Sequence, residues 1–131
     1  MTGQPNLQQL FTMIKPKLQP GDYVFCTLLS PHDIDLQKTI CSFKEEEGIT
    51  VIIEKDLADR QQLSYFYVAA WITLTVHSSL EAVGLTAAFS TALANEGISC
   101  NVVAAFYHDH IFVAKNDAEK AMKILTHLPG L

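Results

Sequence analysis

The second half of the chain shows the clearer pattern of hydrophobic and polar positions. Residues 67–76 are apolar at nearly every position, which predicts a strand buried on both faces at the centre of a sheet. Within residues 83–95, hydrophobic side chains recur at helical spacing, at Leu85, Ala88, Phe89, Ala92 and Leu93. Gly97 stands where a glycine commonly terminates a helix. We therefore expect a long strand followed by an amphipathic helix.

Two shorter strands and a second helix are predicted after Gly97. Residues 98–106 and 111–114 are strand candidates, joined by a tight polar connection at 107–110. Asn116 or Asp117 can cap a last helix, whose inward-facing residues are Ala118, Ala121, Met122 and Leu125. This order is that of a split βαβ unit in a ferredoxin-like fold that lacks its fourth strand. The exposed sheet edge must then be covered by the first half or by another subunit.

The first half predicts a helix, three strands and a helix. The opening helix is indicated by the spacing of Leu7, Leu10, Phe11 and Ile14, and Pro16 closes it. Strands are expected at residues 23–29, 39–43 and 49–53, the last two joined by a hairpin whose acidic run, residues 45–47, is a solvated turn. Asp56 is expected to cap a surface helix over residues 57–63.

Composition narrows the function classes. The chain of 131 residues is 49 % hydrophobic and carries a formal charge of -5, so no basic surface for nucleic acid is expected. Its most apolar stretch is too short to cross a membrane, and residues 1–10 show no secretory signal. Cys26, Cys41 and Cys100 are scattered, without the spacing of a disulfide framework or a zinc site. A protein of the reducing cytoplasm is expected.

Two segments resemble the ACT domain, a small ligand-sensing module. Residues 83–88 (Val-Gly-Leu-Thr-Ala-Ala) are similar to its turn from first strand into first helix, and residues 96–103 (Glu-Gly-Ile-Ser-Cys-Asn-Val-Val) resemble the aspartate kinase-type second strand. Residues 71–79 together with 108–113 are closer still to small, free-standing bacterial double-ACT proteins of unassigned function. One departure is visible: many ACT domains carry Asp and Pro before the glycine, where this chain has Ala82 and Val83.

The resemblance implies an α+β fold of two tandem ferredoxin-like (βαββαβ) ACT units, partly intertwined around a shared antiparallel sheet. A degenerate N-terminal unit over residues 1–66 and a C-terminal unit over 67–131 are expected. It also implies a non-catalytic, regulatory module that binds a small molecule, with an amino acid as the expected ligand. No cofactor is expected. The chain is expected to form a homodimer through sheet edges or helices.

The loop of residues 77–84 is the first candidate ligand site. A helix N-terminus presents unpaired N–H groups and a positive partial charge to a carboxylate, and a glycine lets the backbone approach closely. The expected contacts are His77, Ser78, Ser79, Val83, Gly84 and Leu85. The alternative is structural: Gly84 permits tight packing, and Ser78 with Glu81 forms a capping box.

Asn101 and the string His108, Asp109 and His110 complete the candidate ligand site. A carboxamide suits a zwitterion because it both donates and accepts, although Asn101 can equally be a solvated or sheet-edge residue. His108 and His110 can contact ligand, or hold a metal ion with His77 as third ligand. As a structural alternative, the string is a turn that bonds its own backbone.

Other interpretations remain open. A metal-binding protein or hydrolase would use the three histidines around a metal-activated water, and a thiol enzyme would pair Cys100 with His110 as base. Burial of Cys100 as a small apolar residue argues against the thiol enzyme. Phe66, Tyr67 and Trp71 can line a pocket but are expected in the core. An interaction subunit without any ligand is the third class.

Overall fold

The computed structural model describes residues 14–75 and 84–128. Its strands are β1 (Lys15–Leu18), β2 (Tyr23–Leu28), β3 (Thr39–Lys44), β4 (Ile49–Glu54), β5 (Val68–Thr75), β6 (Asn101–Ala104) and β7 (Asp109–Ala114). Its helices are α2 (Lys55–Arg60), α3 (Leu85–Asn95) and α4 (Ala118–Thr126), with 3-10 turns η1 (Pro31–Asp33), η2 (Leu36–Lys38) and η3 (Lys115–Asp117). None of the helices within the described residues has the length and apolar character needed to span a bilayer. The predicted opening helix falls mainly on residues 7–13, outside the described residues.

The chain folds into two compact units, one inserted into the other along the sequence. The inserted unit is residues 20–69, and the split unit consists of the chain up to Gln19 together with residues from Ala70 onward. β5 contributes its first two residues to the inserted unit, where Val68 and Ala69 pair with β2, and its remaining residues to the split unit. This confirms the α+β class and the intertwined arrangement. The boundary predicted between residues 66 and 67 stays a prediction.

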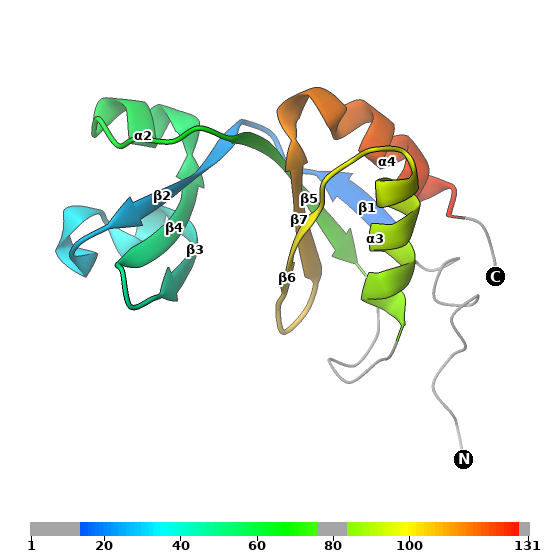
Figure 1. Cartoon of the computed structure of the whole chain (residues 1–131), viewed down its shortest axis with the longest axis horizontal. Helices are drawn as coiled ribbons and strands as arrows, with labels where there is room; N and C mark the ends of the chain where they lie inside the picture. Colours follow the sequence, from blue (N-terminus) through cyan, green and yellow to red (C-terminus); the bar gives the residue numbers. More distant parts are fainter. Residues whose placement is uncertain (1–13, 76–83, 129–131) are drawn as a thin grey trace, which may run out of the picture. The chain divides into compact units, whose positions relative to one another are not determined.

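The split unit has the strand order β1, β5, β7, β6 (Figure 1). β1 pairs antiparallel with β5, with Lys15 opposite Thr75 and Leu18 opposite Ile72. β1, from the first half of the chain, therefore supplies the strand that the second half lacks. This confirms the first of the two alternatives, in which the first half and not another subunit covers the sheet edge. The sequence predicts no strand at residues 15–18, because Pro16 there indicates the end of a helix. A proline is tolerated here because β1 is an edge strand.

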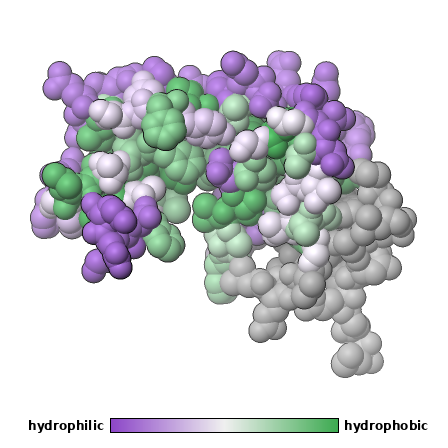
Figure 2. All heavy atoms as spheres, in the orientation of Figure 1, coloured by the Kyte–Doolittle hydropathy of each residue, from purple (hydrophilic) through white to green (hydrophobic). Residues whose placement is uncertain are grey.

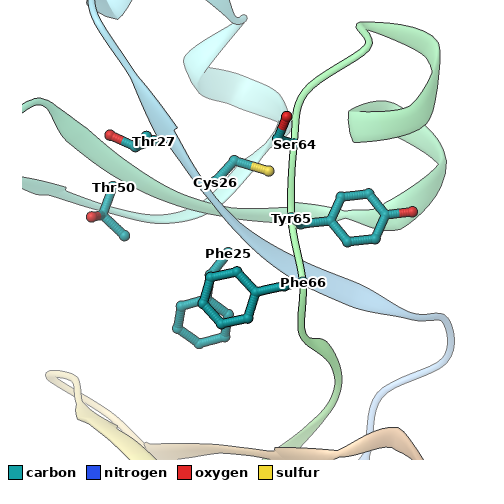
Figure 3. A pocket seen from close by; sticks show the side chains of 7 residues that line it. All are labelled: Phe25, Cys26, Thr27, Thr50, Ser64, Tyr65 and Phe66. Carbon is teal, nitrogen blue, oxygen red and sulfur yellow. The ribbon is translucent and has the colours of Figure 1, made fainter.

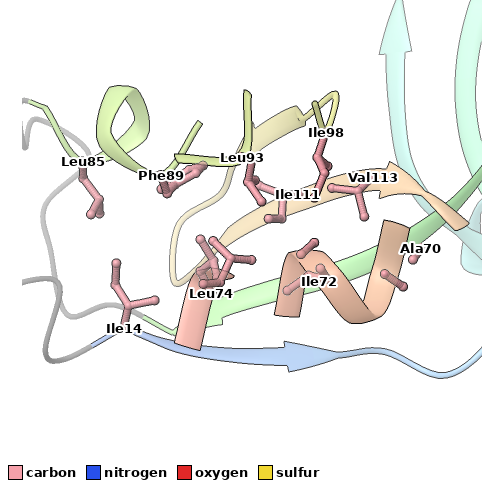
Figure 4. Packing of buried hydrophobic residues seen from close by; sticks show 13 residues of the cluster. Ile14, Ala70, Ile72, Leu74, Leu85, Phe89, Leu93, Ile98, Ile111 and Val113 are labelled. Carbon is pink, nitrogen blue, oxygen red and sulfur yellow. The ribbon is translucent and has the colours of Figure 1, made fainter. Parts of the chain in front are cut away.

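Helices α3 and α4 cover one face of these strands and close a core in which thirteen of the described side chains are buried (Figure 4). Phe89 and Leu93 from α3 and Ala121 and Leu125 from α4 are almost completely buried. Ile72 contributes from the sheet. The predicted inward faces of both helices are confirmed, although Ala88, Ala92 and Met122 are only partly buried. Gly97, at φ 76°, takes the left-handed conformation expected after α3.

The inserted unit has the order β3, β4, β2, β5, with the predicted hairpin between β3 and β4. α2 packs its Leu57 and Ala58 into a core that also holds Val24, Val51 and Ile53. The first helix of a βαββαβ unit is replaced by the short turns η1 and η2. Ile34, between the two turns, is the buried residue that fills that place.

Several predicted boundaries were wrong. Asp56 does not cap its helix, which already begins at Lys55. Asp117 does stand at the N-cap of α4, one of the two positions predicted, but its side chain makes no capping bond. α2 ends at Arg60, because Gln62 is left-handed (φ 58°) and the Leu63 N–H turns back to the Ala58 carbonyl. β6 is confined to Asn101–Ala104, shorter than the predicted 98–106.

Candidate functional site

The turn into α3 retains the features expected of a ligand loop. Gly84 occupies the N-cap position with φ 93°, a left-handed conformation that other residues rarely adopt. No side chain among the described residues caps the helix, and no acidic residue stands in its first turn. Within the described part of the chain, no side chain therefore bonds the N–H groups of that turn. The predicted contacts His77, Ser78, Ser79 and Val83 lie outside the described residues, as does Glu81 of the alternative capping box.

Leu85 belongs to the core. Its side chain is only 3 % exposed and packs in the cluster beneath α3. Of Leu85, only the backbone N–H at the start of α3 can therefore serve a ligand. Leu85 was predicted both to face inward from the helix and to contact the ligand. The buried side chain fits the first prediction.

The β6–β7 turn lies at the same end of the split unit as the start of α3 (Figure 1). The Ala105 N–H donates to the His108 carbonyl at 3.0 Å, so the connection is tighter than predicted and Asp109 and His110 already belong to β7. Because side chains alternate along a strand, Asp109 shares the helix-covered face with Ile111, and His110 lies on the opposite face. Asp109 and the start of α3 thus share both an end and a face.

His110 is held by a small hydrogen-bond network on the open face. Trp71 Nε1 donates to His110 Nδ1 at 3.0 Å, and Thr73 Oγ1 lies 3.2 Å from the same nitrogen. Gln19 Nε2 donates to Thr73 Oγ1 at 3.0 Å. Because an indole N–H can only donate, His110 Nδ1 must be unprotonated, and the neutral ring carries its proton on Nε2. Burial, together with the charge of His108, lowers the pKa of His110 and favours this neutral form.

The sequence did not predict this hydrogen-bond network. Trp71 and Thr73 alternate with core residues along the strand, so the sequence pattern predicts that they share a face. Their contact with His110 could not be predicted, because it depends on the register between β5 and β7. Gln19 gave no signal at all, since it follows the unpredicted strand β1.

His108 has an unused hydrogen-bonding atom. Its Nδ1 is buried and makes no hydrogen bond to any residue that the structure describes. The rings of His108 and His110 lie 6.1 Å apart at nearly right angles. Within residues 14–75 and 84–128, no group of three His, Cys, Asp or Glu side chains is arranged to hold a metal ion. His77, the third ligand of the metal hypothesis, lies outside the described residues.

Asn101 is separated from the other candidates. It begins β6, at the opposite end of the sheet from the β6–β7 turn, and three residues of strand span about 10 Å. Its side chain is exposed, and Nδ2 donates weakly to the Phe112 carbonyl at 3.4 Å. One copy of the split unit therefore brings Gly84, His108 and Asp109 to one end and leaves Asn101 at the other.

The thiol hypothesis finds no support in the geometry. Cys100 packs against the helix-covered core, whereas His110 is on the other face of the sheet. Burial raises the pKa of Cys100 to about 11, so the reactive thiolate is scarce at neutral pH. Cys100 acts as a small apolar residue, as its alternation with Ile98 and Val102 predicted.

Family models for the ACT domain match residues 2–70 and, separately, residues 67–127. The two matches overlap at residues 67–70, where β5 passes from the inserted unit into the split unit. No curated protein matches the chain.

Solved structures give the same fold. A Vibrio cholerae protein of unknown function, described as a possible transport protein, is 48 % identical, with a TM-score of 0.82 over 91 % of this chain and 92 % of that one. The ligand-free regulatory subunit of aspartate kinase from Thermus thermophilus is 10 % identical, with a TM-score of 0.61 over 86 % and 95 %. An allosteric aspartate kinase from Clostridium acetobutylicum is 13 % identical, with a TM-score of 0.59 over 86 % of this chain and 33 % of the enzyme.

The ACT resemblance of the sequence is thus confirmed in both halves. Neither family model describes a catalytic domain, and the strand orders of the two units are those of ferredoxin-like ACT folds. The chain belongs to the ACT domain family.

Proposed function

We propose that this chain is a non-catalytic regulatory module that binds a free amino acid at the N-terminus of α3. The observation that carries the proposal is the left-handed Gly84 at the start of α3, where no described side chain caps the helix. ACT family membership supports a regulatory role for such a turn. The scattered cysteines, which lack the spacing of a disulfide framework, support the cytoplasm as its location.

The two ends of a zwitterion find different partners at this turn. The ligand carboxylate accepts hydrogen bonds from the N–H groups of the first turn of α3, helped by the helix dipole. The ammonium group pairs with Asp109, which lies at the same end and on the same face. Burial raises the pKa of Asp109, so its carboxylate gains from a cation brought next to it. Asp109 thereby replaces the acidic residue that many ACT domains carry before the glycine.

A homodimer accommodates the position of Asn101. Gly84 and Asn101 lie at opposite ends of one unit, so a small ligand that touches both must bridge two copies. Binding would then favour the packing in which the two copies enclose it, because a ligand shifts an equilibrium only by binding one state more tightly. Sedimentation velocity with and without ligand measures this coupling. A monomer that stays monomeric at saturating ligand contradicts the bridging arrangement but not binding at Gly84.

The direct test is a thermal-shift screen of the twenty amino acids, followed by calorimetry. One or a few amino acids should raise the melting temperature by mass action. The corresponding amine and carboxylic acid, each with one charged group, should not. If no amino acid shifts the transition, the chain is better described as a ligand-free interaction subunit. Stoichiometric zinc or another transition metal in the purified protein would contradict the non-catalytic module.

Matched variants separate binding from folding. Gly84→Ala and Gly97→Ala both place a methyl group on a left-handed residue beside α3, at opposite ends of the helix. Both should destabilise the fold by about 1–2 kcal/mol, but only Gly84→Ala should weaken binding, by about tenfold or more. Asp109→Asn should weaken it as well, whereas Asp117→Asn, a carboxylate of the same unit without a capping bond, should not. Equal losses in both members of either pair contradict the site.

A further inference from the structure

The inserted unit contains an apolar groove of about 500 Å³, well away from α3 in the sequence (Figure 3). Its walls are residues of β2, one residue of β4 and the segment that precedes β5, namely Phe25, Cys26, Thr27, Thr50, Ser64, Tyr65 and Phe66. All of them belong to the inserted unit. A volume of this size lies in the range of small-molecule sites in proteins.

The groove exists because β5 pairs with only a short part of β2. The pairing stops at Val24 opposite Val68, and no described strand lies along this edge of β2 beyond that point. The backbone carbonyl of Asp22 accepts a hydrogen bond from the Lys55 N–H, so residues 22 and 55 are a hydrogen-bonded pair. In an antiparallel ladder, every second residue of a strand bonds to a given neighbouring strand. Residues 24, 26 and 28 therefore bond to β4, and Thr27 directs its N–H and C=O toward the groove. These groups can bond a ligand.

The outer wall is tethered to α2. Tyr65 donates from its hydroxyl to Asp59 Oδ1 at 2.6 Å, and Lys55 Nζ donates to Asp59 Oδ2 at 2.9 Å. The Lys55 ammonium also lies 5.9 Å from the centre of the Tyr65 ring. These contacts fix the Ser64–Phe66 segment beside β2 and so give the groove a defined width.

Phe66 contradicts its predicted place in the core, because its side chain is fully exposed. It stands at the rim, and Phe25 on β2 contacts Tyr67 edge to face, with ring centres 6.1 Å apart. Hydrophobic side chains reach the surface over this unit (Figure 2). A large aromatic side chain left in water beside an open apolar groove can gain stability when a ligand covers it.

The lining excludes charge. None of the seven residues carries a charged side chain at neutral pH, and burial raises the pKa of Cys26, which keeps its thiol neutral. The ammonium and carboxylate of an amino acid would find no partner among these side chains, and desolvating them there is costly. The polar groups on offer are hydroxyls and the backbone of Thr27, which suit an uncharged ligand.

We propose that this groove is a second binding site, for a small uncharged molecule with an aromatic ring or a branched apolar group and one hydrogen-bonding group. The ring packs between the β2 face of the groove and Phe66, and the polar group bonds the backbone edge at Thr27. This site differs from the α3 turn in both position and ligand chemistry. It does not depend on amino-acid binding at Gly84.

Indole is a suitable probe, and it can be titrated into the full-length protein while backbone amide NMR signals are followed. Saturable shifts should centre on residues 25–27, 50 and 64–66. Phe66→Ser should weaken indole binding by about tenfold, since it removes one wall at a side chain that nothing covers. Phe43→Ser is the matched control, because Phe43 is also exposed (69 %), lies in the same unit and does not line the groove. It should bind indole like the wild type.

Four results would overturn the proposal. The first is a lack of saturation at millimolar indole, and the second is equal weakening by Phe66→Ser and Phe43→Ser. The third is that phenylalanine shifts the same amides as strongly as indole does. The fourth is a self-association that Phe66→Ser abolishes, which would make a second copy of the chain the occupant. Gly84→Ala should leave indole binding unchanged, so failure of one site is distinguishable from failure of the other.

Discussion

The two units fill the same fold pattern in different ways. In the split unit, α3 and α4 cover one sheet face, and thirteen residues of its described part are buried there, with Phe89 fully enclosed. In the inserted unit, the position of the first helix is taken by the turns η1 and η2, and a smaller core of eight residues relies there on Ile34. The long helix α3 begins without a side-chain cap among the described residues, and its N-terminus is the site proposed for the ligand carboxylate. The short turns η1 and η2 of the inserted unit have no comparable helix N-terminus. The apolar groove of that unit is formed by other residues, beside β2.

Local hydrogen bonds explain why the inserted unit lacks that helix. Ser30 and Asp33 form a reciprocal capping box around η1, and Asp35 accepts a bond from the Gln37 N–H at 3.0 Å. Side chains of this kind satisfy the backbone in turns and compete with a continuing helix. The short segment therefore closes two turns and keeps a single apolar anchor, Ile34.

The largest expected effect tests the difference between the two cores. Phe89→Ala removes a fully buried ring and should lower the free energy of unfolding by about 3–5 kcal/mol, whereas Ile34→Ala, beneath surface turns, should cost about 2 kcal/mol. Urea denaturation measures both losses. Hydrogen exchange should show faster opening of β6 and β7 in the first variant and of β3 and β4 in the second. Equal losses of unfolding free energy in the two variants would mean that Ile34 stabilises its core as much as Phe89 of a complete helix stabilises the other.

The sequence predicted the split unit better than the inserted one. Its helices carry strong periodicity and its central strand is apolar throughout, so α3, α4 and β5 were placed within a few residues. β1 was missed because its sequence, Lys-Pro-Lys-Leu, reads as a helix end, and its pairing with β5 bridges more than fifty residues of chain. The β1–β5 pairing depends on the free edge of β5 in the folded unit, and the local hydrophobic pattern of residues 15–18 does not encode it.

The candidate sites show the same limit. Gly84 could be chosen from the sequence because a glycine before a periodic helix has a local meaning. The separation of Asn101 from Gly84 could not, because it follows from strand direction in the folded unit. The groove beside β2 was also hidden: it depends on where β5 stops pairing, and Phe66 in an apolar sequence context was assigned to the core.

A smaller effect should appear in the pH dependence of the split unit. His110 has a lowered pKa in the folded protein, so the folded state takes up its proton less readily than the unfolded chain, whose ordinary value is 6.5. The associated stability is fully present above that value and is lost as the pH falls below it. Protonation at Nδ1 would also break the bond from Trp71.

His110→Gln tests this, since an amide oxygen can still accept the Trp71 N–H but does not titrate. The difference in unfolding free energy between wild type and variant should shrink between pH 7.5 and pH 5, as the wild type loses stability. His108 and Asp109 also act on His110, through their charges. A difference that stays constant across this range would show that the imidazole is not held neutral by the network.

The smallest expected effect concerns the tether of the inserted unit. The hydrogen bond from Tyr65, followed by that from Lys55, lowers the pKa of Asp59. Tyr65→Phe removes the first contribution and leaves the second, so the pKa of Asp59 should rise toward 3.8 without reaching it, as an NMR titration of its carboxyl group would show. Stability at pH 7 should change little, because these side chains are solvent-screened. Indole binding should weaken, however, since the tether sets the position of Phe66. An unchanged Asp59 pKa would mean that Tyr65 does not hold the groove wall in solution, and the groove would then depend on β2 alone.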